Sequence, residues 1–428
     1  MAGRMSTPAG RRAVVAGVGE TRYTKWGGIT DTSEYGLAVG AVLASLDDAG
    51  IDVRDVDGLC SFAGDRNEST FLAADLGIGE LRYTTMSWLP GGGGACAAVH
   101  GAAMAVEAGQ ADVVVVYRSL CQGQFRRFGR GPGNAPGKGT PGQGAAGAAP
   151  AARPPRVPAL RKTQGLIDTH LAYTLPFGVF GPPIAYAMVM RRHMHRFGTT
   201  TGQMGQVAVT TRAHAARNPR AVMGGRPMTM DDYLASRMVA EPFRLFDCCL
   251  ENDGACAVVV TTAERARDLR AAPVSVVAGA QGTVGGFGHG QFCNVNMDDD
   301  DYTSAGARTV AAHLWEKAEM GPADIDVAQI YDHFTGLVLL SLEDFGFCER
   351  GEGGPFAASG VLAWPDGDLP VNTHGGSLSE AYIHGLNHVV EGVRQLRGSS
   401  TCQVEGAEAC LVTSAAGVPT SALVLAKP

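Results

Sequence analysis

The sequence predicts an α/β protein built from two copies of one structural unit. Strand-like and helix-like segments alternate along the chain. The most apolar segment, ADVVVVYRS at residues 111–119, is typical of a strand buried on both faces beneath helices. In addition, a short pattern recurs at an offset of 269 residues, from residues 49–57 to residues 318–326. Together these observations indicate a duplicated sheet covered by helices.

The elements of the first half follow from apolar spacing and from glycine stops. We predict strands at residues 11–19, 56–62, 111–119 and 274–282, and helices at residues 33–50, 94–109, 184–197 and 202–217. Residues 246–269 are predicted to form a loop, a strand and a charged helix. This order of elements is the one that the second half should repeat.

The second half repeats a helix, a short acidic turn and an apolar strand without a gap. Chance similarity is the alternative, but the matching order of the elements favours duplication. After the repeated strand VAQIY we predict a loop and helix at residues 332–346, a glycine-rich turn and a helix at residues 379–395. Two strands, ACLVTS and SALVLA, end the chain.

Residues 129–158 interrupt this pattern with a run rich in glycine, proline and alanine. Such a run buries too little apolar surface to offset the entropy of ordering, so we predict a flexible insertion. It is either a surface loop expansion or a functional lid. The predicted organisation is an N-terminal half at residues 1–128 and 246–282, a loop region at residues 129–245, and a C-terminal half at residues 283–428.

Composition restricts the partners and the compartment. The chain has 428 residues, 45% of them hydrophobic, and a net charge of −7 without a basic stripe, which argues against nucleic acid and favours small-molecule ligands. The ten cysteines form no CxxC pair, so we expect reduced thiols in a cytoplasmic protein. We expect no signal peptide, because the first residues given contain no apolar core of sufficient length, and no membrane span, because no apolar run approaches the length that a span needs.

The chain resembles the thiolase superfamily. The resemblance rests on the duplicated α/β pattern, on DGACAVVVTTAERARDL near the end of the first half, and on the terminal glycine turn, helix and paired strands. It covers nearly the whole chain outside residues 129–158. More specifically, the chain resembles the sterol-carrier and lipid-transfer branch of the superfamily, and within that branch the steroid side-chain-cleaving aldolases. The resemblance implies a duplicated thiolase fold layered α-β-α-β-α with a loop domain inserted in the first half, a homodimer, and a separate OB-fold and zinc-ribbon (DUF35) partner.

The residues that a thiolase uses for catalysis are exchanged in this sequence. The family's nucleophilic cysteine, at the start of the alanine-rich helix, meets a glycine, which we take to be Gly92, and Cys96 lies about one turn later. The resemblance places Tyr331 at the asparagine of the family's NEAF motif and Tyr382 at the histidine of its GHP motif. Thr413 stands at the second family cysteine. Acyl-enzyme chemistry is therefore not expected.

Two tyrosines suit a retro-aldol cleavage, which needs an enolate-stabilising site, a base and an acid but no nucleophile. The reference pKa of tyrosine, about 10, lets a phenol share a proton with an alcohol when neighbours stabilise the phenolate. We predict Tyr382 as the base and Tyr331 as the acid, with the roles open to exchange, and His333 as a stabilising neighbour. The resemblance implies that a β-hydroxyacyl-CoA yields a 17-ketosteroid and propionyl-CoA, without a metal or organic cofactor.

Glycines around the tyrosines are predicted to let a bulky substrate and its enolate approach the backbone closely. The glycine run lacks the motifs of a phosphate-binding loop, although it precedes a helix. The predicted substrate-binding residues are Gly92, Gly93, Gly94, Asp332, Gly375, Gly376 and Gly417.

Several histidines allow other interpretations. His384 and His388, with Glu391 three residues further on, could bind zinc from one face of a helix, but they lack an HExxH motif and a third His or Cys ligand, so an ordinary helix face is the alternative that we favour. His193 and His195 are expected on a solvated or phosphate-facing surface.

Two other functions stay open at this stage. One is an acyl-CoA thiolase or acyltransferase that uses Cys96 as a displaced nucleophile, against which Cys96 is a small core residue. The other is a lipid carrier or scaffold without catalysis.

Overall fold

The computed structural model describes residues 11–87, 91–124, 174–179, 181–286, 297–414 and 420–428. The predicted insertion at residues 129–158 and Gly417 lie outside the described residues. No helix among the described residues is long and apolar enough to cross a membrane.

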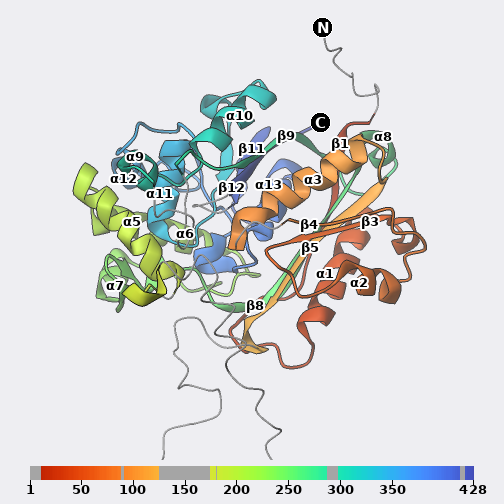
Figure 1. Cartoon of the computed structure of the whole chain (residues 1–428), viewed down its shortest axis with the longest axis horizontal. Coiled ribbons are helices and arrows are strands. Elements are labelled where there is room, and N and C mark those ends of the chain that lie inside the picture. The colour runs from red at the N-terminus through yellow and green to blue at the C-terminus, as the bar shows by residue number, and fades with distance from the viewer. Residues whose placement is uncertain (1–10, 88–90, 125–173, 180, 287–296, 415–419) are drawn as a thin grey trace, which may run out of the picture.

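A ten-stranded sheet runs through the molecule in the order β10-β11-β12-β9-β1-β8-β5-β3-β4, with β2 paired to β8 (Figure 1). The strands of the sheet are β1 Ala13–Glu20, β2 Thr24–Lys25, β3 Gly58–Phe62, β4 Tyr83–Ser87, β5 Val113–Cys121, β8 Asn252–Thr262, β9 Val274–Gly282, β10 Val327–Gln329, β11 Ala409–Ser414 and β12 Thr420–Ala426. A short hairpin, β6 Met238–Ala240 and β7 Phe243–Arg244, stands apart. The halves of the sheet meet where β1 and β9 pair over Val14–Val15 and Val274–Ser275.

Helices cover the sheet and fill the space between its two halves. They are α1 Glu34–Ala49, α2 Ser69–Leu76, α3 Ala95–Glu107, α5 Pro182–Phe197, α6 Thr201–Arg217, α7 Met230–Ala235, α8 Ala263–Ala266, α9 Asp299–Tyr302, α10 Arg308–Ala318, α11 Thr335–Asp344, α12 Gly353–Ala358 and α13 Leu386–Arg397. Figure 1 shows α1 and α2 on one side, α10 and α11 on the other, and α3 and α13 between them.

Three large clusters make up most of the hydrophobic core. The first lies between α1 and the outer face of β1, β3, β5 and β8. The second surrounds α3 and α13, which contact strands of both sheet halves. The third lies between β9–β12 and the helices α10 and α11, with α5 and α6 packed beside them. The predicted α-β-α-β-α layering is therefore confirmed.

The 269-residue repeat corresponds to a repeated local structure. Helix α1 ends in a left-handed cap at Gly50 (φ 74°), and α10 ends in the same way at Glu319 (φ 54°). A single 3-10 turn and a parallel strand follow in both copies. Asp57 accepts the amides that lead into β5, and Asp326 accepts the amides that lead into β11. The duplication read from the sequence is thus present in three dimensions.

The predicted helix at residues 379–395 is wrong at its start. A π-helical turn spans Gly376–Glu380, residues 381–385 form a loop, and α13 begins only at Leu386. The reason is the backbone of His384 (φ 50°) and Gly385 (φ 86°), whose left-handed conformation cannot continue a right-handed helix. This loop carries Tyr382.

Candidate active site

The two tyrosines meet in space although 51 residues separate them. The hydroxyl of Tyr331 donates to the hydroxyl of Tyr382 at 3.0 Å. Tyr331 follows β10 and is 1% exposed, whereas Tyr382 is partly exposed. Both backbones are anchored, because the Tyr331 amide donates to Thr413 at 2.9 Å and the Tyr382 amide donates to Asn252 at 2.6 Å. The phenols are therefore held as a pair at the edge of accessible space.

Gly92 faces this pair from the turn Gly91–Gly94, which leads into α3. A Cβ atom added at Gly92 would lie 2.0 Å from both Cζ and Oη of Tyr331. Since nonbonded carbon atoms normally approach only to about 3.5 Å, no side chain fits there while Tyr331 stays in place. The phenol of Tyr331 thus occupies the space that a nucleophile at position 92 would need.

Cys96 cannot take over as the nucleophile in this arrangement. Its thiol is buried and donates to the Val412 carbonyl at 3.4 Å, and its amide donates to Ser414 at 2.9 Å. Burial raises the pKa of the Cys96 thiol to about 12. A protonated thiol within the central core is a packing group, as one of the two sequence interpretations held.

The two phenols differ in how readily they ionise. Burial, followed by the nearby Tyr382, raises the pKa of Tyr331 well above its usual value. Burial and the nearby Cys249 also raise the pKa of Tyr382, but the hydrogen bond from Tyr331 and the positive charge of Arg118 lower it. The hydrogen bond from Tyr331 and the charge of Arg118 therefore favour the ionised form of Tyr382, whereas the neighbouring Tyr382 disfavours the ionised form of Tyr331.

His333 lies beside the pair but carries no charge there. Its ring is 4.9 Å from that of Tyr331 and 4.6 Å from that of Tyr186. Burial lowers the pKa of His333 to about 3, and its Nδ1 has no partner among the described residues. His333 can therefore not stabilise a phenolate as a cation, and the fixed positive charge near Tyr382 belongs to Arg118 instead.

Asp332, Gly375 and Gly376 shape the turn that precedes Tyr382. The carboxylate of Asp332 is fully buried and accepts the amides of Ser377 at 2.7 Å and Leu378 at 3.2 Å. Gly375 (φ 110°) and Gly376 (φ 56°) have left-handed backbones, and a Cβ at Gly376 would lie 2.1 Å from Oδ2 of Asp332. Gly375 thus precedes the π-helical turn, Gly376 begins it, and Asp332 holds it in shape by accepting two of its amides.

The remaining glycines pack against the sheet. The carbonyl of Gly93 accepts a hydrogen bond from Ser421 at 2.6 Å. A Cβ at Gly94 would lie 2.7 Å from Cβ of Phe62 on β3. The glycine turn is thus held tightly between β3 and β12, next to the phenol pair.

The histidines do not form a metal site. His384 precedes α13 and accepts from Arg118, whereas His388 lies on α13 and contacts Asp332 at 3.2 Å, so the premise of one helix face was wrong. No group of three His, Cys, Asp or Glu side chains that could hold a metal occurs in the described part of the chain. His193 is buried between Thr199 and Glu343, contrary to the predicted surface position, whereas His195 is exposed.

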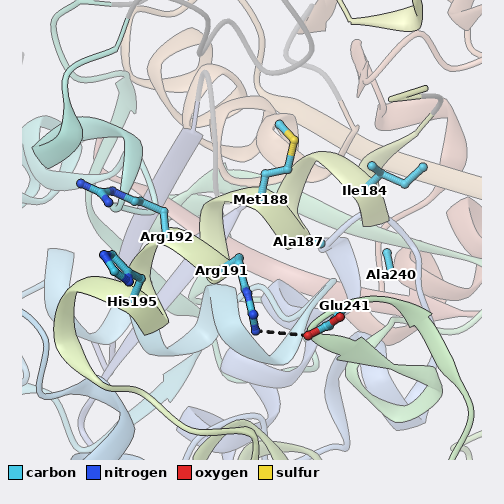
Figure 2. Close-up of a pocket in the computed structure, with 8 residues that line it drawn as sticks. All are labelled: Ile184, Ala187, Met188, Arg191, Arg192, His195, Ala240 and Glu241. Carbon is cyan, nitrogen blue, oxygen red and sulfur yellow. Dashed lines mark ion pairs between the residues drawn. The ribbon is translucent and has the colours of Figure 1, made fainter. Parts of the chain in front are cut away.

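A groove of about 710 Å³ lies along the face of α5 that is opposite Tyr186 (Figure 2). It is lined by Ile184, Ala187, Met188, Arg191, Arg192, His195, Ala240 and Glu241. Arg191 pairs with Glu241 at 3.2 Å, and Arg192 pairs with Asp299 at 2.5 Å. None of the predicted site residues lines this groove. The opposite face of α5 buries Tyr186 against His333.

Sequence reasoning missed one part of the site. Arg118 on β5 forms a buried ion pair with Asp65 and a second contact with His384. One signal was available, because a charged residue interrupts the most apolar strand of the chain. No local pattern linked that arginine to the distant loop of His384.

Fold and site together define a protein of the thiolase fold in which the phenol of Tyr331 fills the space beside Gly92 and pairs with the phenol of Tyr382. Comparison with known proteins agrees. A family model described as "Thiolase C-terminal domain-like" matches residues 291–426. The chain is 43% identical to the 17-hydroxy-3-oxo-4-pregnene-20-carboxyl-CoA lyase of Mycobacterium tuberculosis over 97% of this chain and 99% of that protein. It is 42% identical to the steroid side-chain-cleaving aldolase of Thermomonospora curvata over 96% and 97% of the two chains.

Among solved structures, the Ltp2-ChsH2(DUF35) aldolase matches with a TM-score of 0.84 and 39% identity over 99% of both chains. The chain therefore belongs to this family of carbon–carbon lyases within the thiolase superfamily.

Proposed function

We propose that this protein cleaves the carbon–carbon bond of a β-hydroxyacyl-CoA, with a steroid that carries a hydroxyl at C17 and a CoA thioester on its side chain as the substrate. The products are a 17-ketosteroid and propionyl-CoA. The named relatives support this substrate class. The observation that carries the proposal is the contact of the two phenol oxygens at 3.0 Å beside Gly92.

The two tyrosines can supply every proton transfer that a retro-aldol cleavage needs. Tyr382, as the phenolate, takes the proton of the C17 hydroxyl while the C17 carbonyl forms and the bond to the α-carbon breaks. The electron pair of that bond becomes the enolate of propionyl-CoA. Tyr331 then gives its proton to the α-carbon. Transfer of a proton from Tyr382 to Tyr331 along their hydrogen bond restores both phenols to their starting states.

The proposal also covers partners and setting. Similarity to an aldolase complex that contains a DUF35 protein supports a separate OB-fold partner for this chain. A homodimer and a cytoplasmic location complete the proposal, and the cysteines among the described residues are all free thiols, which suits a reducing compartment. The reaction requires no metal or organic cofactor.

The other two functions receive less support. Acyl transfer would need a thiolate, but Cys96 is buried and protonated. A mere carrier would not need two anchored phenols in contact at an accessible edge.

The test is to purify the chain with its OB-fold partner and to supply a 17-hydroxysteroid CoA ester. We expect equal amounts of 17-ketosteroid and propionyl-CoA. Tyr331→Phe and Tyr382→Phe should each slow turnover by about 10²- to 10⁴-fold, because each removes a positioned acid–base group. Tyr35→Phe is the matched control, since it removes only an exposed hydrogen bond to Asp75.

Cys96→Ala should keep nearly normal turnover and should form no covalent acyl-enzyme. Near-normal turnover of both site variants, or binding without cleavage by the wild-type complex, would defeat the proposal.

A further inference from the structure

A buried ion pair joins Arg118 on β5 to Asp65, which follows β3, and lies close to the tyrosine pair. Nη1 of Arg118 donates to Asp65 at 2.6 Å, and the side chains are 5% and 0% exposed. Asp65 is further satisfied by the amide and the side chain of Asn67, at 2.8 and 2.9 Å. A charge in a strand interior is costly unless it is paired and hydrogen-bonded, and this one is.

The other edge of the same guanidinium contacts His384. Nε and Nη2 of Arg118 lie 3.1 and 2.9 Å from Nδ1 of His384. A guanidinium can only donate, so Nδ1 must accept and the imidazole carries its proton on Nε2. Burial and the charges of Arg118 and Arg66 lower the pKa of His384 well below its ordinary value. Its ring is therefore neutral.

His384 contacts Tyr382 in turn. The two rings stand at 86° with centroids 5.0 Å apart. The contact depends on a left-handed backbone at His384 (φ 50°), a conformation that costs energy in residues other than glycine and that is frequent at functional sites. Between residues 371 and 393, the partly exposed side chains are those of Tyr382 and His384, and the others are buried. Both rings thus reach the same accessible edge.

Among the described residues, the other groups that act on the Tyr382 phenol are uncharged. Tyr331 donates to it, and burial raises the pKa of the Cys249 thiol well above its ordinary value, so that the thiol is protonated. The pKa of Tyr186 is likewise raised by burial, and then by Tyr382. His333 is neutral. The remaining influence on the pKa of Tyr382 is Arg118, which lowers it.

We propose that Asp65, Arg118 and His384 form a positioning chain, which keeps a fixed positive charge near the phenol of Tyr382 and holds its ring toward the substrate. Asp65 orients the guanidinium, and His384 connects it to the tyrosine ring without adding charge. The proposal rests on the proposed function, because only a base at Tyr382 needs a stabilised phenolate. It goes beyond that function by adding three positioning residues that exchange no proton with the substrate.

The test measures ionisation at residue 382 directly. A fluorinated tyrosine is placed at position 382 of the full-length chain in complex with its partner, and its fluorine NMR signal is followed against pH. Substituting Arg118→Met together with Asp65→Asn removes the charge without leaving an unpaired carboxylate. We expect the apparent pKa of the residue-382 phenol to rise by on the order of one unit. The control Glu20→Gln with Arg394→Met removes another partly buried ion pair, of 2.7 Å, and should leave the titration unchanged.

Cleavage kinetics distinguish an effect of the Arg118 charge on Tyr382 from a purely structural role of the ion pair. With natural tyrosine at 382, the Arg118→Met/Asp65→Asn variant should lower kcat by about tenfold and leave KM unchanged. The fluorinated tyrosine, whose phenol is more acidic, should restore most of that loss. An unchanged titration, or a loss of kcat that the fluorinated residue does not restore, would overturn the proposal.

If the double variant fails to fold, His384→Asn replaces it. Asparagine tolerates the left-handed backbone and keeps an acceptor for Arg118, but it removes the ring that contacts Tyr382. We expect a lower kcat at unchanged KM, and unchanged kcat would contradict the role of His384. The titration needs no substrate, so it succeeds or fails independently of the proposed cleavage.

Discussion

A side chain at position 92 should dismantle the tyrosine pair. We consider Gly92→Ala, the smallest possible change at the glycine that faces Tyr331. The added Cβ would lie 2.0 Å from Cζ and Oη and 2.2 Å from Cε2 of that ring. An ordinary contact requires about 1.5 Å more. Either the ring or the glycine turn has to move.

Neither side of this contact can yield cheaply. Tyr331 is 1% exposed and hydrogen-bonded through its hydroxyl and its amide. The turn at position 92 leads into α3, whose first amides donate to Ser414 at 2.9 Å and Ser421 at 3.1 Å. Overpacking of such a core costs about 1–3 kcal/mol. For a chain of this length the unfolding entropy is about 0.9 kcal/mol/K, so Tm should fall by roughly 1–3 °C.

The effect on turnover should be much larger than the effect on stability. A displaced phenol removes one positioned acid–base group, which corresponds to a loss of about 10²- to 10⁴-fold in kcat. Steady-state cleavage and thermal unfolding of the complex measure the two effects. Gly79→Ala is the matched control, because a Cβ at Gly79 would meet nothing within 4 Å.

A second substitution distinguishes overlap from other causes. In a Tyr331→Ala background, which lacks the clashing ring, Gly92→Ala should cost much less stability than it does in the wild type, although activity stays lost. In a Tyr331→Phe background, which keeps Cζ and Cε2 in place, Gly92→Ala should cost as much stability as in the wild type. Normal turnover and normal Tm of Gly92→Ala, or an equal cost of Gly92→Ala in both backgrounds, would refute the steric reasoning.

Two further predictions concern pH and the turn before Tyr382. Tyr382 acts in its deprotonated form, and its pKa is raised. The cleavage rate should therefore increase by about tenfold per pH unit below that pKa and fall as the solution is acidified. A flat rate profile between pH 6 and 9 would contradict the assignment of Tyr382 as the base. Asp332→Asn should lower the free energy of unfolding by about 3 kcal/mol, since the carboxylate accepts two buried amides and contacts His388. Denaturant titration measures this loss, and an unchanged free energy of unfolding would contradict the prediction.

Much of the fold could be predicted because its signals are local. The buried strand at β5 and the helix stop at Gly50 follow from composition and from a left-handed cap. The repeat also follows, because Asp57 and Asp326 perform the same hydrogen bonding in both copies. The helix of Tyr382 was misplaced because an ordinary residue, His384, adopts a left-handed conformation that its sequence context does not reveal.

The site was predictable only in part. Tyr331 and Tyr382 were found because family motifs align with them, and their contact then depends on α13, which follows Tyr382, packing against β10, which precedes Tyr331. Arg118 was missed because its partners, Asp65 and His384, lie 53 and 266 residues away. The neutral state of His333 could not be inferred, since it results from complete burial and not from neighbouring residue types.

The overlap between position 92 and the ring of Tyr331 also restricts how this lineage could have changed. A side chain at position 92 overlaps the ring of Tyr331 in its present position, so if an ancestor used a thiolate at position 92, its loss before or together with the gain of the aromatic ring avoids the overlap. The reverse change meets the same obstacle, because a cysteine introduced at position 92 would overlap the ring of Tyr331, and we expect removal of that ring alone to cost aldolase activity. Divergence at this pocket is therefore hard to reverse by single substitutions.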